Sequence, residues 1–221
     1  MSNNFDILIT NTNRSIYYLK ILKQNKLIPK NIIYLDNNKK NYIFNKLKKI
    51  LKNKKYNLKT FKTDNIDDVK VVNYLLNNRI RNIIYSGYPG KIIYNKKLLK
   101  NKNLIHSHSG RLPNYRGSTT IYYSILNERK IYCTTFIINP KIDSGKILLI
   151  KNYPLPKKIT SIDNKYDNEI RAQNILYVIK NLNILKKKKL KNKFYLPYYV
   201  IHPVLRSVVF YGKKMNRNLK R

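Results

Sequence analysis

Short apolar runs alternate with longer amphipathic stretches over residues 5–150. The runs are rich in isoleucine, leucine and tyrosine, a composition typical of buried strands. They predict six strands, at residues 5–10, 31–35, 82–86, 104–108, 132–139 and 147–150. Between the runs, apolar residues recur at helical spacing, which predicts helices at 13–24, 42–51, 67–77 and 119–126. Asn13 or Ser15 is expected to cap the first helix and Ser118 the last, while Asp67 and Asp68 suit the first turn of the third.

This alternation predicts an α/β, Rossmann-like fold, with a mostly parallel sheet and helices on both faces. In such sheets, ligands bind beyond the carboxyl ends of the strands. The sequence contains neither G-x-G-x-x-G nor G-x-x-x-x-G-K-[ST], so it lacks the usual local signatures of a dinucleotide or P-loop site.

The pattern changes after about Pro156, so residues 1–156 are expected to form the main domain. Residues 157–221 are expected to form a short helical and extended appendage. Within it, residues 167–185 have helical periodicity, 186–193 are a solvated basic run, 194–209 suit a strand or hairpin, and 213–221 suit a frayed tail.

The charge of the chain is extreme, with 47 Lys+Arg against 10 Asp+Glu and a net charge of +37. One interpretation is an anionic partner such as nucleic acid, a nucleotide or a membrane surface. The other is a coding bias, because lysine, asparagine, isoleucine and tyrosine dominate and Ala172 is the only alanine. The basic residues are spread along the whole chain, which favours the bias. In either case, the charge attracts anionic substrates.

The sequence also suggests where the protein works. Cys133 is the only cysteine, which excludes an intrachain disulfide and predicts a cytoplasmic location. The first 20 residues have no signal-peptide pattern, and no run reaches 18 apolar residues, so no membrane partner is expected. No pattern specifies an oligomeric state.

Rare residues gather in one region of the chain. Five of the six glycines lie between Gly87 and Gly145, and His106 and His108 lie two apart in a predicted strand, where side chains share a face. Glycines and a proline shape the loop that follows, and Asp143 stands beside a later glycine turn. A carboxylate near a histidine orients its ring and favours its protonation. This region is therefore the predicted site.

These segments resemble the formyltransferase superfamily, whose pattern is Asn-x-His-x-Ser-x-Leu-Pro-x-x-x-Gly followed by Leu-Asp-x-Gly. The chain supplies His108, Leu112, Pro113, Tyr115, Arg116 and Gly117 in register, and then Ile142-Asp143-Ser144-Gly145. The segment Ser86-Gly87-Tyr88-Pro89-Gly90 is similar to a family loop that helps to hold folate. The resemblance covers roughly residues 5–153 and identifies residues 1–156 as a formyltransferase catalytic domain.

The resemblance implies N-formyl transfer from 10-formyltetrahydrofolate to an amine, without a metal. It implies that His106 and His108 donate hydrogen bonds to the formyl oxygen and that Asp143 orients a histidine and takes the amine proton. The folate co-substrate would be held by Asp143 and by Ser86, Gly87, Tyr88, Pro89 and Gly90. The acceptor would be held by Ser109, Gly110, Arg116 and Gly117, with Arg116 either positioning a phosphate or being a surface charge.

Two positions depart from the family pattern. His106 stands where the family has asparagine, and Gly110 stands where it has serine. A histidine still offers a ring N–H, so a donor role is expected to survive. Gly110 is expected to open space beside the site. Both changes predict a divergent branch with a different acceptor or with tuned chemistry.

The predicted acceptor is a small phosphorylated amine. The altered motif and the short C-terminal segment fit an amino-sugar nucleotide best. An alternative is an enzyme like methionyl-tRNA formyltransferase without its full C-terminal domain, because residues 157–221 do not suggest a complete barrel. Glycinamide ribonucleotide transformylase keeps the asparagine that this chain lacks. A further alternative is an inactive relative that binds folate or RNA. Any nucleic-acid binding is expected to be non-specific.

Overall fold

The computed structural model describes residues 4–38, 42–52, 56–185 and 195–218. Its centre is a seven-stranded sheet in the order β3-β2-β1-β4-β5-β6-β7. Neighbouring strands from β3 to β5 pair in parallel, whereas β6 is antiparallel to β5 and β7 to β6. The strands are β1 (Asp6–Thr10), β2 (Asn31–Leu35), β3 (Asn57–Phe61), β4 (Asn82–Tyr85), β5 (Asn103–His108), β6 (Ile131–Ile138) and β7 (Gly145–Tyr153).

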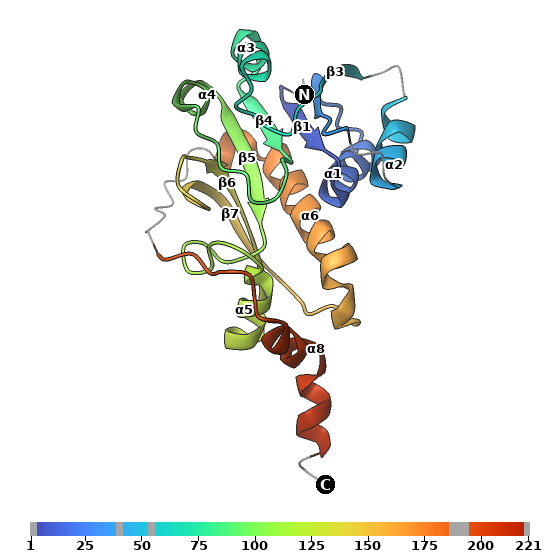
Figure 1. Cartoon of the computed structure of the whole chain (residues 1–221), viewed down its shortest axis with the longest axis vertical. Helices are drawn as coiled ribbons and strands as arrows, with labels where there is room; N and C mark the ends of the chain where they lie inside the picture. The colour runs from blue at the N-terminus through green and yellow to red at the C-terminus, as the bar shows by residue number, and fades with distance from the viewer. Residues whose placement is uncertain (1–3, 39–41, 53–55, 186–194, 219–221) are drawn as a thin grey trace.

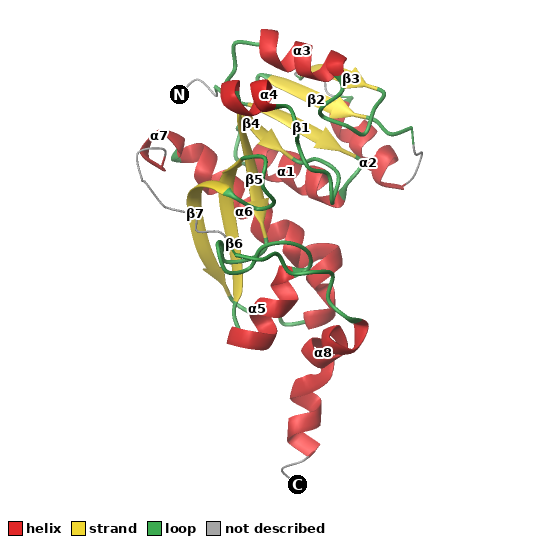
Figure 2. Ribbon diagram, turned by 60° about the vertical axis from the view of Figure 1, so that its left-hand side comes forward, coloured by secondary structure: helices red, strands yellow, loops and turns green. Residues whose placement is uncertain are grey.

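Helices cover both faces of this sheet, as Figures 1 and 2 show. The α-helices are α1 (Asn13–Gln24), α2 (Tyr42–Leu51), α3 (Val69–Asn77), α4 (Lys96–Asn101), α5 (Thr120–Glu128), α6 (Asp167–Lys180), α7 (Leu182–Leu185) and α8 (Pro203–Asn218). Alternate residues of β1 point to opposite faces: Ile7 packs in a core with α1 and α6, and Leu8 in a core with α3 and α4. The predicted Rossmann-like α/β fold is confirmed.

Most elements begin and end close to their predicted bounds, and β2 and α2 match them. Two short elements, β3 and α4, were not predicted. The predicted helix caps need correction. Thr12 caps α1, because its hydroxyl accepts the N–H of Ser15, and Thr119 rather than Ser118 precedes α5.

The C-terminal part differs from the prediction. Residues 195–202 are mostly extended and lead into α8, so the predicted strand or hairpin at 194–209 is wrong from Pro203 onward. The helix also continues to Asn218 within the predicted frayed tail, while the basic run 186–193 and residues 219–221 lie outside the described residues. Figures 1 and 2 show α8 extending from the body of the molecule beyond α5.

The predicted boundary at residue 156 separates segments that share a core. Helix α6 packs against α1 and against β5, β6 and β7. Its Ala172, Ile175 and Val178 are buried in the cluster that also contains Ile16 and Leu19 of α1. Residues 167–180 are therefore part of the sheet's covering layer. Among the described helices, none has the length and apolarity needed to cross a membrane.

Candidate functional site

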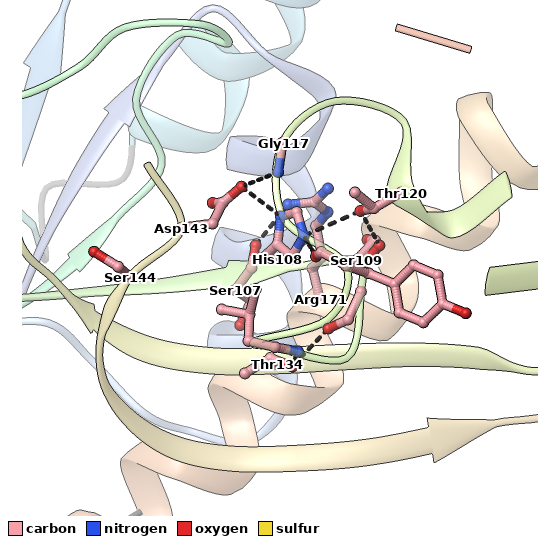
Figure 3. Close-up of polar contacts among 12 residues, drawn as sticks. Ser107, His108, Ser109, Gly117, Thr120, Thr134, Asp143, Ser144 and Arg171 are labelled. Atoms are coloured by element: carbon pink, nitrogen blue, oxygen red, sulfur yellow. Dashed lines mark hydrogen bonds and ion pairs between the residues drawn. The ribbon is translucent and has the colours of Figure 1, made fainter. Parts of the chain in front are cut away.

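His108 lies at the carboxyl end of β5 with only 5% of its surface exposed. Its Nδ1 is 3.5 Å from Oδ2 of Asp143, and its Nε2 is 2.8 Å from the carbonyl oxygen of Tyr115 (Figure 3). The Thr120 hydroxyl, 3.0 Å from Nε2, donates to the Ser109 carbonyl and so presents a lone pair to the ring. Both ring nitrogens thus face oxygen atoms that can accept a hydrogen bond.

Asp143 is held in the turn before β7. Its φ of 41° lies in the left-handed region, which aspartate tolerates better than most residues. Oδ2 also accepts the backbone N–H of Gly117 at 2.8 Å. The carboxylate therefore joins the 142–145 turn to both His108 and the loop after β5, so the two predicted sequence elements meet in space.

Gly110 and Gly117 lie where neighbouring atoms leave no room for a side chain. A Cβ at Gly110 would lie 2.7 Å from the Tyr115 carbonyl oxygen and 2.8 Å from Nε2 of His108. The expectation that Gly110 opens space beside the site is therefore wrong, because the loop and the histidine ring fill that space. Gly117, with φ of 93°, is equally restricted: a Cβ there would lie 2.2 Å from the carbonyl oxygen of Tyr198.

An open cavity of about 170 Å³ lies beside His108, between the start of α5 and the start of α6. Within it, the Ser109 hydroxyl donates to Asp167, which also binds Nε of Arg171 at 2.9 and 3.0 Å. Arg171 donates in turn to the Ser107 carbonyl at 2.6 Å. The lining residues are His108, Ser109, Gly117, Thr119, Thr120, Ile121, Tyr122, Asp163, Asp167 and Arg171. The lining therefore combines apolar side chains with charges of both signs.

His106 has surroundings different from those of His108. Its ring packs edge-on to Tyr85 and Phe136, and Nδ1 is 3.2 Å from the Tyr85 carbonyl oxygen. Burial lowers the pKa of His106 well below its usual value, and Arg14 and Arg171 lower it further. A neutral ring that donates from Nδ1 to a carbonyl leaves a lone pair on Nε2. This geometry does not support a second oxyanion donor at position 106.

The Ser86–Gly90 segment lies at the carboxyl end of β4. Arg14 of α1 donates to the Ser86 hydroxyl at 3.3 Å and to the Gly87 carbonyl. The Tyr88 hydroxyl donates to the Leu35 carbonyl at 3.3 Å, at the end of β2, and no described hydrogen bond joins it to His108 or Asp143. Pro89 and Gly90 are exposed, and the space beside Gly90 is open. A role of this segment in folate binding stays a prediction.

Arg116 is 1% exposed, so the alternative of a surface charge is wrong. Burial lowers the pKa of its guanidinium, and nearby Asp143 opposes that effect. Its backbone carbonyl accepts the N–H of Tyr198 at 2.7 Å. Arg116 thus lies inside the loop, near the Asp143 carboxylate.

Residues 197–201 form a strap along this loop. Tyr198 pairs with Gly117 in a parallel bridge, and its ring lies 5.8 Å from that of Tyr115 and 4.4 Å from that of Tyr123. The Ile201 N–H donates to the Thr119 hydroxyl at 2.8 Å. The strap therefore fixes the loop that carries Gly117, whose N–H holds Asp143.

Four charged residues of the site were not predicted, and one of them, Asp163, lies just before the predicted helix at 167–185. Arg14, Asp167 and Arg171 belong to no motif and lie on predicted helices as ordinary polar residues. The only signal was the i, i+4 spacing of Asp167 and Arg171, which is common on exposed helix faces.

Comparison with known proteins gives local sequence matches and extensive structural ones. No family model matches the chain. Methionyl-tRNA formyltransferases from Flavobacterium psychrophilum and Flavobacterium johnsoniae are 49% identical over 45 residues and 36% identical over 75 residues. These segments cover 20% and 34% of this chain but only 14% and 23% of those proteins.

The structural matches cover nearly the whole chain. A sugar N-formyltransferase from Shewanella sp. has a TM-score of 0.62 at 17% identity, with 93% of this chain and 86% of that chain covered. Glycinamide ribonucleotide transformylase 1 from Symbiobacterium toebii has a TM-score of 0.61 at 12% identity, with 90% and 93% covered. The chain has the fold of these enzymes, and its predicted resemblance to the formyltransferase superfamily is confirmed.

Proposed function

We propose that this protein is an N-formyltransferase that moves a formyl group from 10-formyltetrahydrofolate to a primary amine. The contact of His108 with Asp143 carries the proposal, because it lies at a strand end and is fixed by the loop after β5. His108 also lines the adjacent cavity. A carboxylate and an imidazole side by side supply the two functions that acyl transfer to an amine needs. These are a donor to a developing oxyanion and an acceptor for the amine proton.

In the proposed reaction, His108 donates a hydrogen bond to the formyl oxygen as that oxygen gains negative charge. Asp143 removes a proton from the attacking amine, directly or through water. Nε2 of His108 lies 2.8 Å from the Tyr115 carbonyl oxygen, so the Nδ1 edge of the ring, next to Asp143, is proposed to face the substrate. His106 stays neutral and accepts rather than donates at Nε2.

The folate co-substrate supplies the formyl carbon. The residues proposed to hold it are Asp143 and the Ser86–Gly90 segment. Pro89 and Gly90 are exposed, and open space beside Gly90 leaves its backbone accessible to a flat ring. Cys133 is a buried thiol, which suits a reducing compartment such as the cytoplasm.

The proposed acceptor is an amino-sugar nucleotide. The near-complete coverage of the sugar N-formyltransferase from Shewanella sp. supports this choice. The net charge of +37 attracts the phosphates of a nucleotide. The local identity to methionyl-tRNA formyltransferases favours an aminoacyl-tRNA acceptor as the second candidate.

A formyl-transfer assay with 10-formyltetrahydrofolate tests both candidates. The acceptor panel contains amino-sugar nucleotides, glycinamide ribonucleotide and methionyl-tRNA. Turnover with an amino-sugar nucleotide is expected, whereas turnover only with methionyl-tRNA would favour the second candidate. Calorimetry that detects no folate binding to the folded protein would contradict the proposal as a whole.

A further inference from the structure

Large apolar side chains are exposed along residues 195–211. Leu196 and Tyr199 have 83% and 87% of their surface exposed, and Val204 of α8 has 62%. The complete set is Tyr195, Leu196, Tyr199, Val200, Val204, Leu205, Val208 and Tyr211. Single exposed apolar residues are ordinary on protein surfaces, but a contiguous set marks an interaction surface.

Within α8, the large apolar side chains that are exposed share one face. Val204, Leu205, Val208 and Tyr211 follow the spacing i, i+1, i+4, i+7. The opposite face packs on the body, where Val209 is buried and the Phe210 ring lies 5.8 Å from that of Tyr122. The first turns of α8 are thus anchored while their outer apolar face points to solvent.

An ion pair reinforces this anchoring. Arg206 binds the Asp163 carboxylate, and its guanidinium lies 5.5 Å from the centre of the Tyr122 ring. These contacts hold α8 by its inner face, so the outer face is presented in a fixed orientation.

The charge of the same region is uniformly positive. After Glu169 the sequence contains no aspartate or glutamate. Helix α8 itself includes Arg206, Lys213, Lys214 and Arg217, and the last three directly follow the exposed apolar turns. A partner that binds this surface must therefore offer both an apolar region and negative charge.

We propose that residues 195–218 bind an anionic lipid surface, with the outer face of α8 in the boundary between headgroups and acyl chains. Helices that lie in this boundary combine an apolar face of aliphatic and aromatic residues with lysine and arginine elsewhere. Anionic headgroups complement the positive charge. A second copy of this chain would instead bring a like charge of +37 toward the same surface. The proposal is separate from the formyl-transfer function and does not depend on it.

Binding to a lipid surface would revise the expectation that the protein has no membrane partner, which was based on the absence of a spanning segment and of a signal-peptide pattern. It agrees with the interpretation of the charge as a sign of an anionic partner. The mode of binding is peripheral. It requires no described helix to cross the bilayer.

Vesicle flotation with the full chain tests the proposal. Vesicles of phosphatidylcholine and phosphatidylglycerol in equal parts are compared with vesicles of phosphatidylcholine alone. Binding to the anionic vesicles is expected, with much weaker binding to the neutral ones and a decrease as salt rises. The triple variant Val204→Ser, Leu205→Ser, Val208→Ser is expected to bind anionic vesicles at least about tenfold more weakly.

The matched control is Val69→Ser with Ile184→Ser, which removes apolar side chains that are 71% and 65% exposed elsewhere on the molecule. This control is expected to bind like the unchanged protein, and circular dichroism checks that both variants are folded. Equal vesicle binding by the triple variant and the unchanged protein would overturn the proposal. A dimer in sedimentation that the triple variant dissociates would overturn it in favour of a second copy.

Discussion

At the residue scale, His108 and Asp143 form the ion pair on which the proposed reaction depends. His108→Ala and Asp143→Asn are each expected to reduce kcat/KM at least about a hundredfold, because each removes a group that acts on developing charge. Asparagine tolerates the positive φ at position 143 and can still accept the Gly117 N–H, so that variant is expected to stay folded. Steady-state kinetics with a thermal unfolding control checks both effects. Near-normal turnover in either variant would mean that the pair is not catalytic.

His106 is expected to respond differently to asparagine and alanine. Asparagine restores the family residue and can donate to the Tyr85 carbonyl as His106 does, so activity within about tenfold of normal is expected. Alanine removes that donor and the ring contacts with Tyr85 and Phe136, and is expected to lose more. Equal losses in the two variants would instead favour proton transfer by the imidazole.

The pH dependence of stability gives a second readout for His106. Its pKa is lowered in the folded protein from the usual 6.5. As pH falls below about 6.5, the unfolded chain therefore takes up a proton that the folded protein does not, and stability decreases. His106→Asn is expected to remove this part of the acid destabilisation. Urea unfolding at a series of acid pH values measures the free energy of unfolding of both proteins. The same loss of stability at acid pH in the variant and in the unchanged protein would contradict a neutral, desolvated His106 ring.

Replacing Gly110 by serine, the residue of the family pattern, is expected to destabilise the protein. A Cβ there meets the Tyr115 carbonyl and the His108 ring at under 3.0 Å, so Gly110→Ser should lower the free energy of unfolding by about 1–3 kcal/mol. The control is Gly90→Asn, because Gly90 has open space around it and asparagine tolerates positive φ. Denaturant unfolding compares the two. Equal small losses would show that the loop adjusts freely.

At the element scale, the strap of residues 197–201 is expected to support both stability and activity. Tyr198→Ala removes ring contacts with Tyr115 and Tyr123, and should lower the free energy of unfolding by about 1–3 kcal/mol. Activity should fall with it, since the strap fixes the loop that holds Asp143, and Tyr198→Phe should restore both. The neighbouring Tyr199→Ala is the control, because that side chain is 87% exposed. An equal effect from Tyr199→Ala would remove the special role of Tyr198.

The elements that sequence predicts well are those whose side chains are buried in a regular pattern. Strand β2 is buried at every residue and was predicted to its bounds. Strand β3 is an edge strand with four exposed residues out of five, so it shows no apolar run. Helix α8 is rich in valine, which favours strands by propensity, yet its apolar spacing is helical. The strand propensity of valine therefore led to the wrong prediction for this segment, whereas the apolar spacing would have predicted a helix.

The candidate site was predictable where a local motif carries it. His108, Gly117 and Asp143 lie close together as their pattern implied. Arg14, Asp167 and Arg171 come from α1 and α6, far from the motif in sequence, and only tertiary packing brings them near it. The different surroundings of the two histidines also follow from packing, since both stand on the same side of one strand.

At the scale of the whole molecule, the charge of +37 predicts nucleic-acid binding without selectivity. Such binding should weaken steeply as salt rises, because it depends on counterion release. Filter binding of initiator methionyl-tRNA and of unrelated tRNAs across a salt series measures it, and similar affinities with similar salt slopes are expected. Salt-resistant preference for the initiator tRNA would support an aminoacyl-tRNA acceptor instead.

The contact between the strap and the motif loop also bears on how the protein is made. The Ile201 N–H and the Thr119 hydroxyl that it binds are 82 residues apart in sequence, so this contact closes a long loop of chain. While the chain is being translated, β1 to β5 emerge before their loop has its strap. A nascent chain that lacks residues 197–201 thus has the sheet and both histidines but an unsupported reaction loop. The proposed reaction would therefore require residues 197–201, which are translated after both histidines and after all seven strands of the sheet.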